Sequence, residues 1–324
     1  MPTKNILVVG GAGYIGSHMT AWLTDLGHTP VVLDDLSTGH RDAVSDAECI
    51  EGSIADADLL DRVFKSRPFD AVMHFASFIQ VGESVKFPEK YYQNNVVNTL
   101  NLLTAMLKHK INQFIFSSTA AVYGEPHTLP IDENHPIQPI NPYGHSKSMV
   151  EQILADLMRA HGLQYAVLRY FNAAGADPAG RLSERHEPET HLIPLILQVA
   201  LGQRDAITVY GNDYATPDGT CIRDYVHVTD LCDAHFKALS LLEQGQKSCI
   251  YNLGTGQGHS VNEVIEAARE ITGCAISVRY GTRREGDPAV LVADARRAMQ
   301  DLHWVPRYSD LKTIIQHAWN TYKK

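Results

Sequence analysis

The sequence predicts an α/β protein with a parallel, doubly wound sheet, and three observations lead to this class. Short apolar runs such as residues 6–9, 31–33 and 113–118 have the length of strands buried on both faces. Helical patterns separate these runs, the longest at residues 91–109 and 143–161. A glycine-rich turn directly follows the first run. Strands that alternate with helices in this way form parallel sheets with helices on both faces.

This alternation stops near Asn172, which predicts a second, smaller lobe. With 324 residues and 44% hydrophobic content, the chain can bury more than one core. We therefore expect a first domain at residues 1–172, to which the chain returns at about 222–253. Residues 173–221 and 254–324 are expected to form a smaller α/β C-terminal lobe for the substrate.

The first apolar run ends in a turn whose glycines predict a dinucleotide site. Gly10, Gly13 and Gly16 permit a tight turn, a close approach of a pyrophosphate and close packing of the next helix. The start of that helix offers unpaired N–H groups to phosphates. Asp34, eighteen residues after Gly16, suits the ribose hydroxyls of NAD and would repel the 2′-phosphate of NADP. The first domain is therefore predicted to be Rossmann-like and to bind NAD.

A second motif, residues 141–147, predicts acid–base chemistry. Asn141 is suited to cap a helix that begins at Pro142, which places Tyr143 in the first turn and Lys147 one turn later. The lysine cation and the helix start are expected to lower the pKa of Tyr143, so that it serves as a base toward an alcohol. Thr119, at the end of a strand, is expected to share a proton with the substrate oxygen.

Composition excludes several classes of partner and location. A net charge of −9 argues against nucleic acid or an anionic membrane, so local arginines must hold any anionic ligand. We expect no signal peptide before the first strand, and no apolar run of the sequence approaches the ~18 residues of a membrane span. The sixteen histidines lack metal-ligand spacing, so we expect no metal site. An odd number of scattered cysteines predicts reduced thiols and a cytoplasmic location. They are Cys49, Cys221, Cys232, Cys249 and Cys274.

An ordered set of motifs along nearly the whole chain resembles the UDP-glucose 4-epimerase (UDP-galactose 4-epimerase) family of the extended short-chain dehydrogenase/reductase superfamily. Any one of these motifs could occur by chance, but the ordered set could not. They include Gly-Gly-Ala-Gly-Tyr-Ile-Gly-Ser-His at 10–18, Phe-Ser-Ser-Thr-Ala-Ala-Val-Tyr-Gly at 116–124, Pro-Tyr-Gly-His-Ser-Lys at 142–147, Leu-Arg-Tyr-Phe-Asn at 168–172 and Asp-Gly-Thr-Cys-Ile-Arg-Asp-Tyr at 218–225.

The resemblance implies a reaction and a set of site residues. UDP-glucose and UDP-galactose would be interconverted by transient oxidation at C4, rotation of the 4-keto sugar and return of the hydride. The family's catalytic positions fall on Tyr143, Lys147 and Thr119. Its NAD contacts fall on Gly10, Gly13, Tyr14, Ile15, Asp34, Asn94 and Tyr170, beside Gly16 of the turn. Its nucleotide-sugar contacts fall on Asn172, Arg223, Arg284 and Asp287, with Leu291 where the family sets the size of the sugar pocket.

The resemblance further implies a homodimer built from helices near 91–109 and 143–161, although these helices could equally face the protein's own core. Leu291 is intermediate in size, which predicts weaker activity on UDP-N-acetylhexosamines. Three positions depart from the family pattern without touching the reacting carbon: Ser53 near the adenine, Ile79 beside the cofactor and His191 near the uracil.

Two other functions were weighed against this one. A nucleotide-sugar 4,6-dehydratase needs an acid–base pair directly after the Thr119 position, where this chain has Ala120 and Ala121. A non-catalytic NAD-binding sensor would not need the complete set of Tyr143, Lys147 and Thr119. The sequence therefore favours the epimerase.

Overall fold

The computed structural model describes residues 2–284 and 286–323, and the chain forms two compact units. Each unit is built from several stretches of the chain. The first comprises Met1–Gly124, Ile137–Arg169 and Cys232–Tyr251. The second comprises Glu125–Pro136, Tyr170–Leu231 and Asn252–Lys324.

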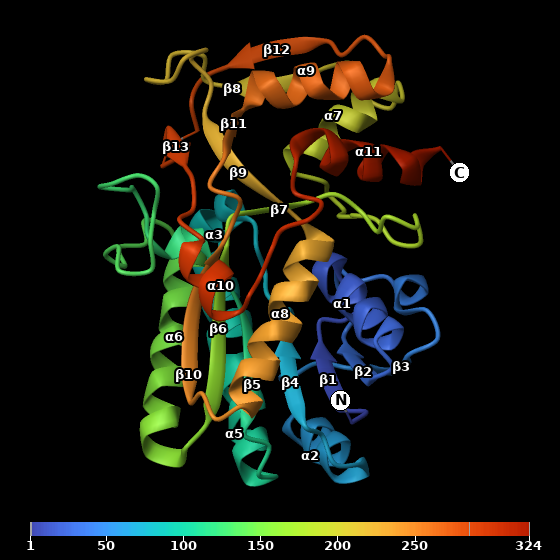
Figure 1. Ribbon diagram of the computed structural model, residues 1–324, viewed down its shortest axis with the longest axis vertical. Helices are drawn as coiled ribbons and strands as arrows, with labels where there is room; N and C mark the ends of the chain where they lie inside the picture. The colour runs from blue at the N-terminus through green and yellow to red at the C-terminus, as the bar shows by residue number, and fades with distance from the viewer. Residues whose placement is uncertain (1, 285, 324) are drawn as a thin grey trace. The chain divides into compact units, whose positions relative to one another are not determined.

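A seven-stranded sheet forms the centre of the first unit, as the alternating pattern predicts (Figure 1). The pairings of the first, second and fourth strands are parallel, and the chain crosses between strands through helices. In spatial order the strands are β10 (Ser248–Leu253), β6 (Gln164–Tyr170), β5 (Gln113–Thr119), β4 (Ala71–His74), β1 (Asn5–Val9), β2 (Thr29–Asp34) and β3 (Glu48–Glu51).

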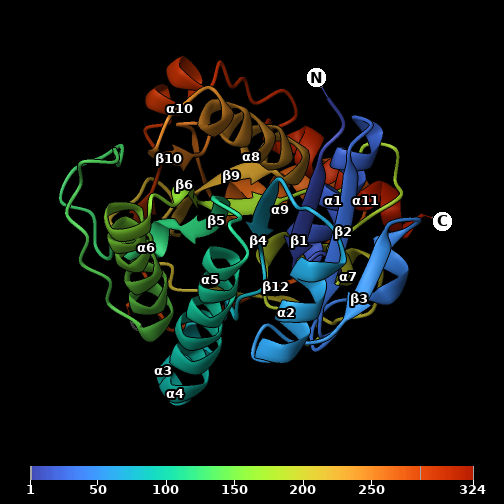
Figure 2. The ribbon, with the colours of Figure 1, turned by 90° about the horizontal axis from the view of Figure 1, so that it is seen from below.

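Helices cover both faces of this sheet. Figure 2 shows α2 (Ala57–Ser66), α5 (Thr99–Lys108) and α6 (Pro142–His161) along one face, with α1 (Tyr14–Asp25) and α8 (Val228–Glu243) along the other. Right-handed crossovers explain this, because the chain moves across the sheet in opposite directions after β1 and after β3. Shorter helical segments are η1 (Arg41–Val44), α3 (Val81–Lys86), α4 (Pro88–Tyr91), η2 (Tyr92–Asn98) and η3 (Ala120–Val122).

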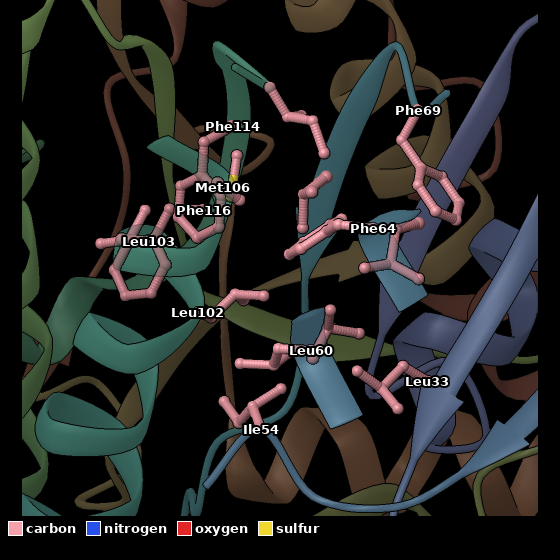
Figure 3. Close-up of a cluster of buried hydrophobic side chains, with 14 of the residues drawn as sticks. Leu33, Ile54, Leu60, Phe64, Phe69, Leu102, Leu103, Met106, Phe114 and Phe116 are labelled. Carbon is pink, nitrogen blue, oxygen red and sulfur yellow. The ribbon is translucent and has the colours of Figure 1, made fainter. Parts of the chain in front are cut away.

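The main core of the first unit lies between the sheet and the helices α2, α5 and α6 (Figure 3). Leu60 of α2, Leu103 of α5 and Phe114 of β5 are completely buried there. Burial of each such side chain stabilises the fold by roughly 1.5–3 kcal/mol. These contacts fix the positions of the strands whose ends carry the predicted site.

The second unit contains two small sheets. In one, β9 (Ile222–His227) pairs with β7 (Asn172–Ala174), β11 (Gly258–Ser260) and β13 (Val290–Leu291). In the other, β8 (Ile207–Tyr210) pairs with β12 (Val278–Gly281). Three helices pack together beside them: α7 (Leu192–Ala200), α9 (Val261–Thr272) and α11 (Leu311–Tyr322) (Figure 1). A short helix, α10 (Arg296–Asp301), precedes α11.

One expectation from the sequence is wrong, and one expected helix is present with a different geometry in its first half. Residues 222–227 were expected to rejoin the first domain, but β9 pairs in the second unit, and the chain re-enters the first unit only at Cys232. The helix expected at 91–109 is interrupted by η2, a π-helical segment, where the amide of Asn95 bonds the backbone of Phe78 and the hydroxyl of Ser146. In the part of the chain that the structure describes, no helix has the length and apolarity needed to cross a membrane.

Candidate functional site

Close contacts with the backbone explain two of the three glycines in the turn after β1. Gly10 has a φ of +77°, and a Cβ there would lie 2.5 Å from the backbone nitrogen of Ala76. A Cβ on Gly16 would lie 2.0 Å from the carbonyl oxygen of Gly10. At Gly13 a Cβ would meet nothing closer than 3.4 Å. The glycine at position 13 therefore leaves the approach to the start of α1 open.

The start of α1 is suited to receive an anion. Gly13 is the residue that precedes the helix, and it cannot supply a side-chain cap to the first N–H groups. The first turn, which contains Tyr14 and Ile15, carries no acidic residue. Uncapped N–H groups and the positive end of the helix dipole together favour a phosphate at this place. These residues fit a dinucleotide pyrophosphate.

Asp34 ends β2 beside this turn. Its carboxylate accepts hydrogen bonds of 2.9 Å from the backbone N–H groups of Ala12 and Leu36. Burial raises the pKa of Asp34, while these two bonds favour the ionised form. Each oxygen keeps a further lone pair, so the carboxylate can also accept from ribose hydroxyls.

The start of α6 forms as the sequence predicts. The side chain of Asn141 accepts a 2.9 Å hydrogen bond from the backbone N–H of Gly144, and Pro142 is the first helical residue. A Cβ on Gly144 would lie 2.5 Å from the carbonyl oxygen of Ala121, so the helix start packs closely against η3. This contact positions Tyr143 next to the end of β5.

Tyr143 and Thr119 are brought together by that arrangement. Burial raises the pKa of Tyr143 to about 12, and a hydrogen bond with the side chain of Thr119 opposes this in part. The expectation of a lowered pKa is therefore wrong for the chain by itself.

Lys147 lies one turn further along α6 and is almost completely buried. Its Nζ donates hydrogen bonds to the hydroxyl of Ser77 at 2.9 Å and to the carbonyl of Ser117 at 2.6 Å. Burial lowers the pKa of Lys147 to about 7, and the negative charge of Glu151 partly opposes this. Lys147 thus links the carboxyl ends of β4 and β5 through two neutral acceptors.

Near Lys147 lies a buried network of hydrogen bonds that the sequence analysis did not predict. Glu151 accepts hydrogen bonds from the guanidinium of Arg169 and from the hydroxyl of Ser118, and Arg169 also donates to the hydroxyl of Tyr123 at 3.0 Å. All of these side chains are buried. Glu151 lies one turn after Lys147. An acidic residue on the inward face of a predicted helix is the sequence feature that could have indicated this network. These hydrogen bonds connect α6 to β5 and β6.

The second unit gathers most of the predicted sugar-nucleotide residues along β9. Register pairs Asn172 of β7 with Tyr225, and Leu291 of β13 with Arg223. Arg223 is mostly buried and donates to the carboxylate of Asp287 and, at 2.7 Å, to the carbonyl of Ile222.

Two further predicted residues of the second unit lie outside this group on β9. The guanidinium of Arg284 stacks 4.2 Å from the ring centre of Tyr210, at the end of β8. Tyr170, expected at the cofactor, is the last residue of β6 and is half buried.

Known proteins are similar to this chain over nearly its whole length. Residues 6–254 match the NAD dependent epimerase/dehydratase family. This match spans the first unit's glycine turn, the start of α6 and β9. The chain therefore belongs to the NAD dependent epimerase/dehydratase family.

Within that family, the chain is similar to UDP-glucose 4-epimerases. It is 51% identical to the UDP-glucose 4-epimerase of Halalkalibacterium halodurans, over 98% of this chain and 96% of that protein. The crystal structure of the Brucella ovis UDP-glucose 4-epimerase in complex with NAD superposes with a TM-score of 0.96 at 48% identity, covering 98% of both chains. The Bifidobacterium longum enzyme in complex with NAD+ and UDP has a TM-score of 0.93 at 38% identity, again covering 98% of both chains.

Proposed function

We propose that this chain interconverts UDP-glucose and UDP-galactose by transient oxidation of the hexose at C4, with NAD as its cofactor. The observation that carries the proposal is the hydroxyl pair of Tyr143 and Thr119 at the carboxyl end of β5, with Lys147 buried one turn further along α6. Full-length similarity to UDP-glucose 4-epimerases supports the same reaction.

The cofactor is assigned to residues of the glycine turn and the neighbouring strand ends. Its pyrophosphate would meet the start of α1 at Gly13, Tyr14 and Ile15, with Gly10 and Gly16 shaping the turn. Asp34 would accept from the adenosine ribose. Asn94 and Tyr170 would contact the rest of the cofactor. When bound, NAD supplies the acceptor and donor of the C4 hydride.

Proton transfer is assigned to Tyr143 and Thr119. The phenolate of Tyr143 would take the proton of the 4-hydroxyl group, and Thr119 would relay it within hydrogen-bond reach. Because burial raises the pKa of Tyr143, ionisation requires a nearby cation, and NAD+ carries one on its nicotinamide ring. Two donors of Lys147 are used by Ser77 and Ser117, and its third would hold the nicotinamide ribose.

The UDP group is assigned to Asn172, Arg223, Arg284 and Asp287. A guanidinium binds a diphosphate through paired hydrogen bonds, and Asp287 orients Arg223 for that purpose. Holding UDP while the 4-keto sugar turns lets the hydride return to its other face without loss of the intermediate. Leu291, beside Arg223 in register, would bound the sugar pocket.

The direct test is to incubate the purified protein with UDP-galactose and no added cofactor. We expect UDP-glucose to form, since the NAD is retained between turnovers. A protein that yields no UDP-glucose even after NAD is added would contradict the proposal.

We further propose that the protein forms a homodimer through the helical surface of η2, α5 and α6. Val97, Leu100 and Met149 are each more than 40% exposed there, although they are apolar. Replacing Leu100 and Met149 together by Glu should give a monomer in light scattering, whereas Val305→Glu, at an exposed apolar site of the second unit, should not. A wild-type monomer would contradict this proposal.

We also propose a cytoplasmic location. Cys49, Cys221 and Cys274 are partly accessible thiols in the structure, which suits a reducing compartment. Fractionation of the producing cells, with a cytoplasmic marker enzyme as control, would test it.

A further inference from the structure

Four potential metal ligands meet in the segment that leads into α7. Glu184, His186, Glu189 and His191 belong to the second unit, and of the four only His191 falls on a position that the family resemblance places near the uracil. Each offers one ligand atom, and these four atoms all lie within 4.8 Å of one another. Eight consecutive residues therefore supply two imidazoles and two carboxylates to one point.

The spacing of these atoms matches a tetrahedral site. The Nδ1 atom of His191 lies 2.8 Å from Glu184 Oε1 and 3.0 Å from Glu189 Oε1. The Nδ1 atom of His186 lies 3.2 Å from Glu184 Oε1 and 3.8 Å from Glu189 Oε2. Ligands around a zinc ion with bonds of ~2.0–2.1 Å are about 3.3 Å apart in a tetrahedron. The remaining separations are at most 4.8 Å, so the ligand atoms would have to close by up to ~1.5 Å around an ion.

The donors of this cluster are shared among its acceptors. Each Nδ1 atom carries one hydrogen at most, while the two Nδ1 atoms together make four approaches of 2.8–3.8 Å to carboxylate oxygens. The buried carboxylate of Glu184 accepts from both imidazoles. An ion in the centre would meet all four ligand atoms at once.

Charge is consistent with an ion at this place. Two carboxylates face two imidazole rings whose centres lie 4.9 Å apart. One divalent ion would balance both carboxylates while both imidazoles stay uncharged.

The ligands are also held in place before any ion arrives. The backbone N–H groups of Thr190 and His191 both donate to Glu189 Oε1 at 2.8 Å, which leaves Glu189 Oε2 toward His186. The side chain of Glu184 is only 6% exposed. Ligands fixed in this way lose little conformational entropy on binding a metal.

We propose that Glu184, His186, Glu189 and His191 form a binding site for a divalent transition-metal ion of the zinc type. Two imidazole nitrogens and two carboxylate oxygens at tetrahedral spacing suit Zn²⁺. Because His191 directly precedes α7, the ion would fasten the preceding loop to the start of this helix. The role is structural. This proposal replaces the expectation, drawn from the spacing of the histidines in the sequence, that the chain has no metal site.

The test measures metal binding and not turnover. The full-length protein is stripped with a chelator and titrated with Zn²⁺ against a chromophoric competitor, and with Co²⁺ for its visible spectrum. We expect one Zn²⁺ per chain and the intense d–d absorption of tetrahedral Co²⁺. His186→Gln with His191→Gln should lower the affinity by at least the roughly 10- to 100-fold that even the loss of an outer-shell partner costs.

Matched variants keep the test decisive. Glu184→Gln preserves the size of a ligand side chain and should weaken binding in a protein whose circular dichroism is unchanged. Glu187→Gln lies in the same segment outside the cluster, and His161→Gln lies on the exposed end of α6, so both should bind Zn²⁺ like the wild type. No stoichiometric Zn²⁺ in the wild type, or equal affinity in the ligand variants and these controls, would overturn the proposal.

Discussion

The two units hold their functional cations in opposite ways. Lys147 of the first unit is buried against two neutral acceptors, and burial lowers its pKa to about 7. Arg223 of the second unit is mostly buried as well, but it is paired with the carboxylate of Asp287. A lysine can lose its proton under these conditions and a guanidinium cannot. The first unit is thus suited to proton chemistry and the second to holding a permanent anion.

The largest effect expected from this difference between the units follows from removing the proposed proton-transfer group of the first unit. Tyr143→Phe should lower turnover by about a hundredfold or more, the scale expected for loss of a positioned acid or base. Bound NAD should remain, because the phenol does not shape the glycine turn. Steady-state assays and the absorbance of released cofactor measure the two effects. Tyr280→Phe, at an exposed tyrosine, is the control. Near-normal turnover of Tyr143→Phe would refute its role.

The second unit should fail in binding and not in chemistry. Arg223→Met removes charged hydrogen bonds worth about 1.5–3 kcal/mol, so KM for UDP-galactose should rise roughly 10- to 150-fold. Asp287→Asn should weaken binding less, since it leaves the guanidinium charged. Initial rates over a range of substrate concentrations separate KM from kcat. If Arg223→Met lowered kcat alone, the division of labour between the units would be wrong.

Leu291 offers a smaller test of how the second unit selects its sugar. Leucine should leave room for a poorer turnover of UDP-N-acetylglucosamine. Leu291→Tyr should suppress this activity about tenfold, the lower end of what a poor fit in an apolar pocket costs, and affect UDP-galactose much less. Parallel kcat/KM measurements on both substrates decide the matter. Equal losses would place Leu291 outside the pocket.

A further test concerns stability and not turnover: the pH dependence of the free energy of unfolding that Lys147 causes. Its folded pKa of about 7 lies below the unfolded value of ~10.4, so between these limits the unfolded chain binds more protons. The free energy of unfolding should therefore rise with pH in this window, by at most about 1.4 kcal/mol per unit. Urea unfolding of the cofactor-free protein at pH 7.5 and 9 should show this rise, and Lys147→Met should reduce it. An identical slope in the variant would contradict the pKa assignment.

Local features of both units could be predicted from the sequence because a few neighbouring residues determine them. The strand, glycine turn and helix at the start of the chain follow from apolar runs and from backbone geometry at Gly10 and Gly16. The Asn141 cap needs only the N–H group three residues later.

Features that depend on distant parts of the chain were not predictable in this way. Residues 222–227 form a strand, but nothing in their sequence says that it pairs with β7 and β13 in the second unit. The raised pKa of Tyr143 depends on the surroundings that bury it, which only the folded chain supplies. The convergence of Glu184 and His191 likewise depends on the path of an irregular loop.

The most direct test of the proposed chemistry follows the hydrogen at C4 of the sugar. The protein is incubated with UDP-galactose that carries deuterium at C4, and the product is analysed by mass spectrometry and NMR. Because the hydride is returned within one bound complex, we expect UDP-glucose that keeps its deuterium at C4. Loss of the deuterium to solvent, or the absence of UDP-glucose, would contradict the account.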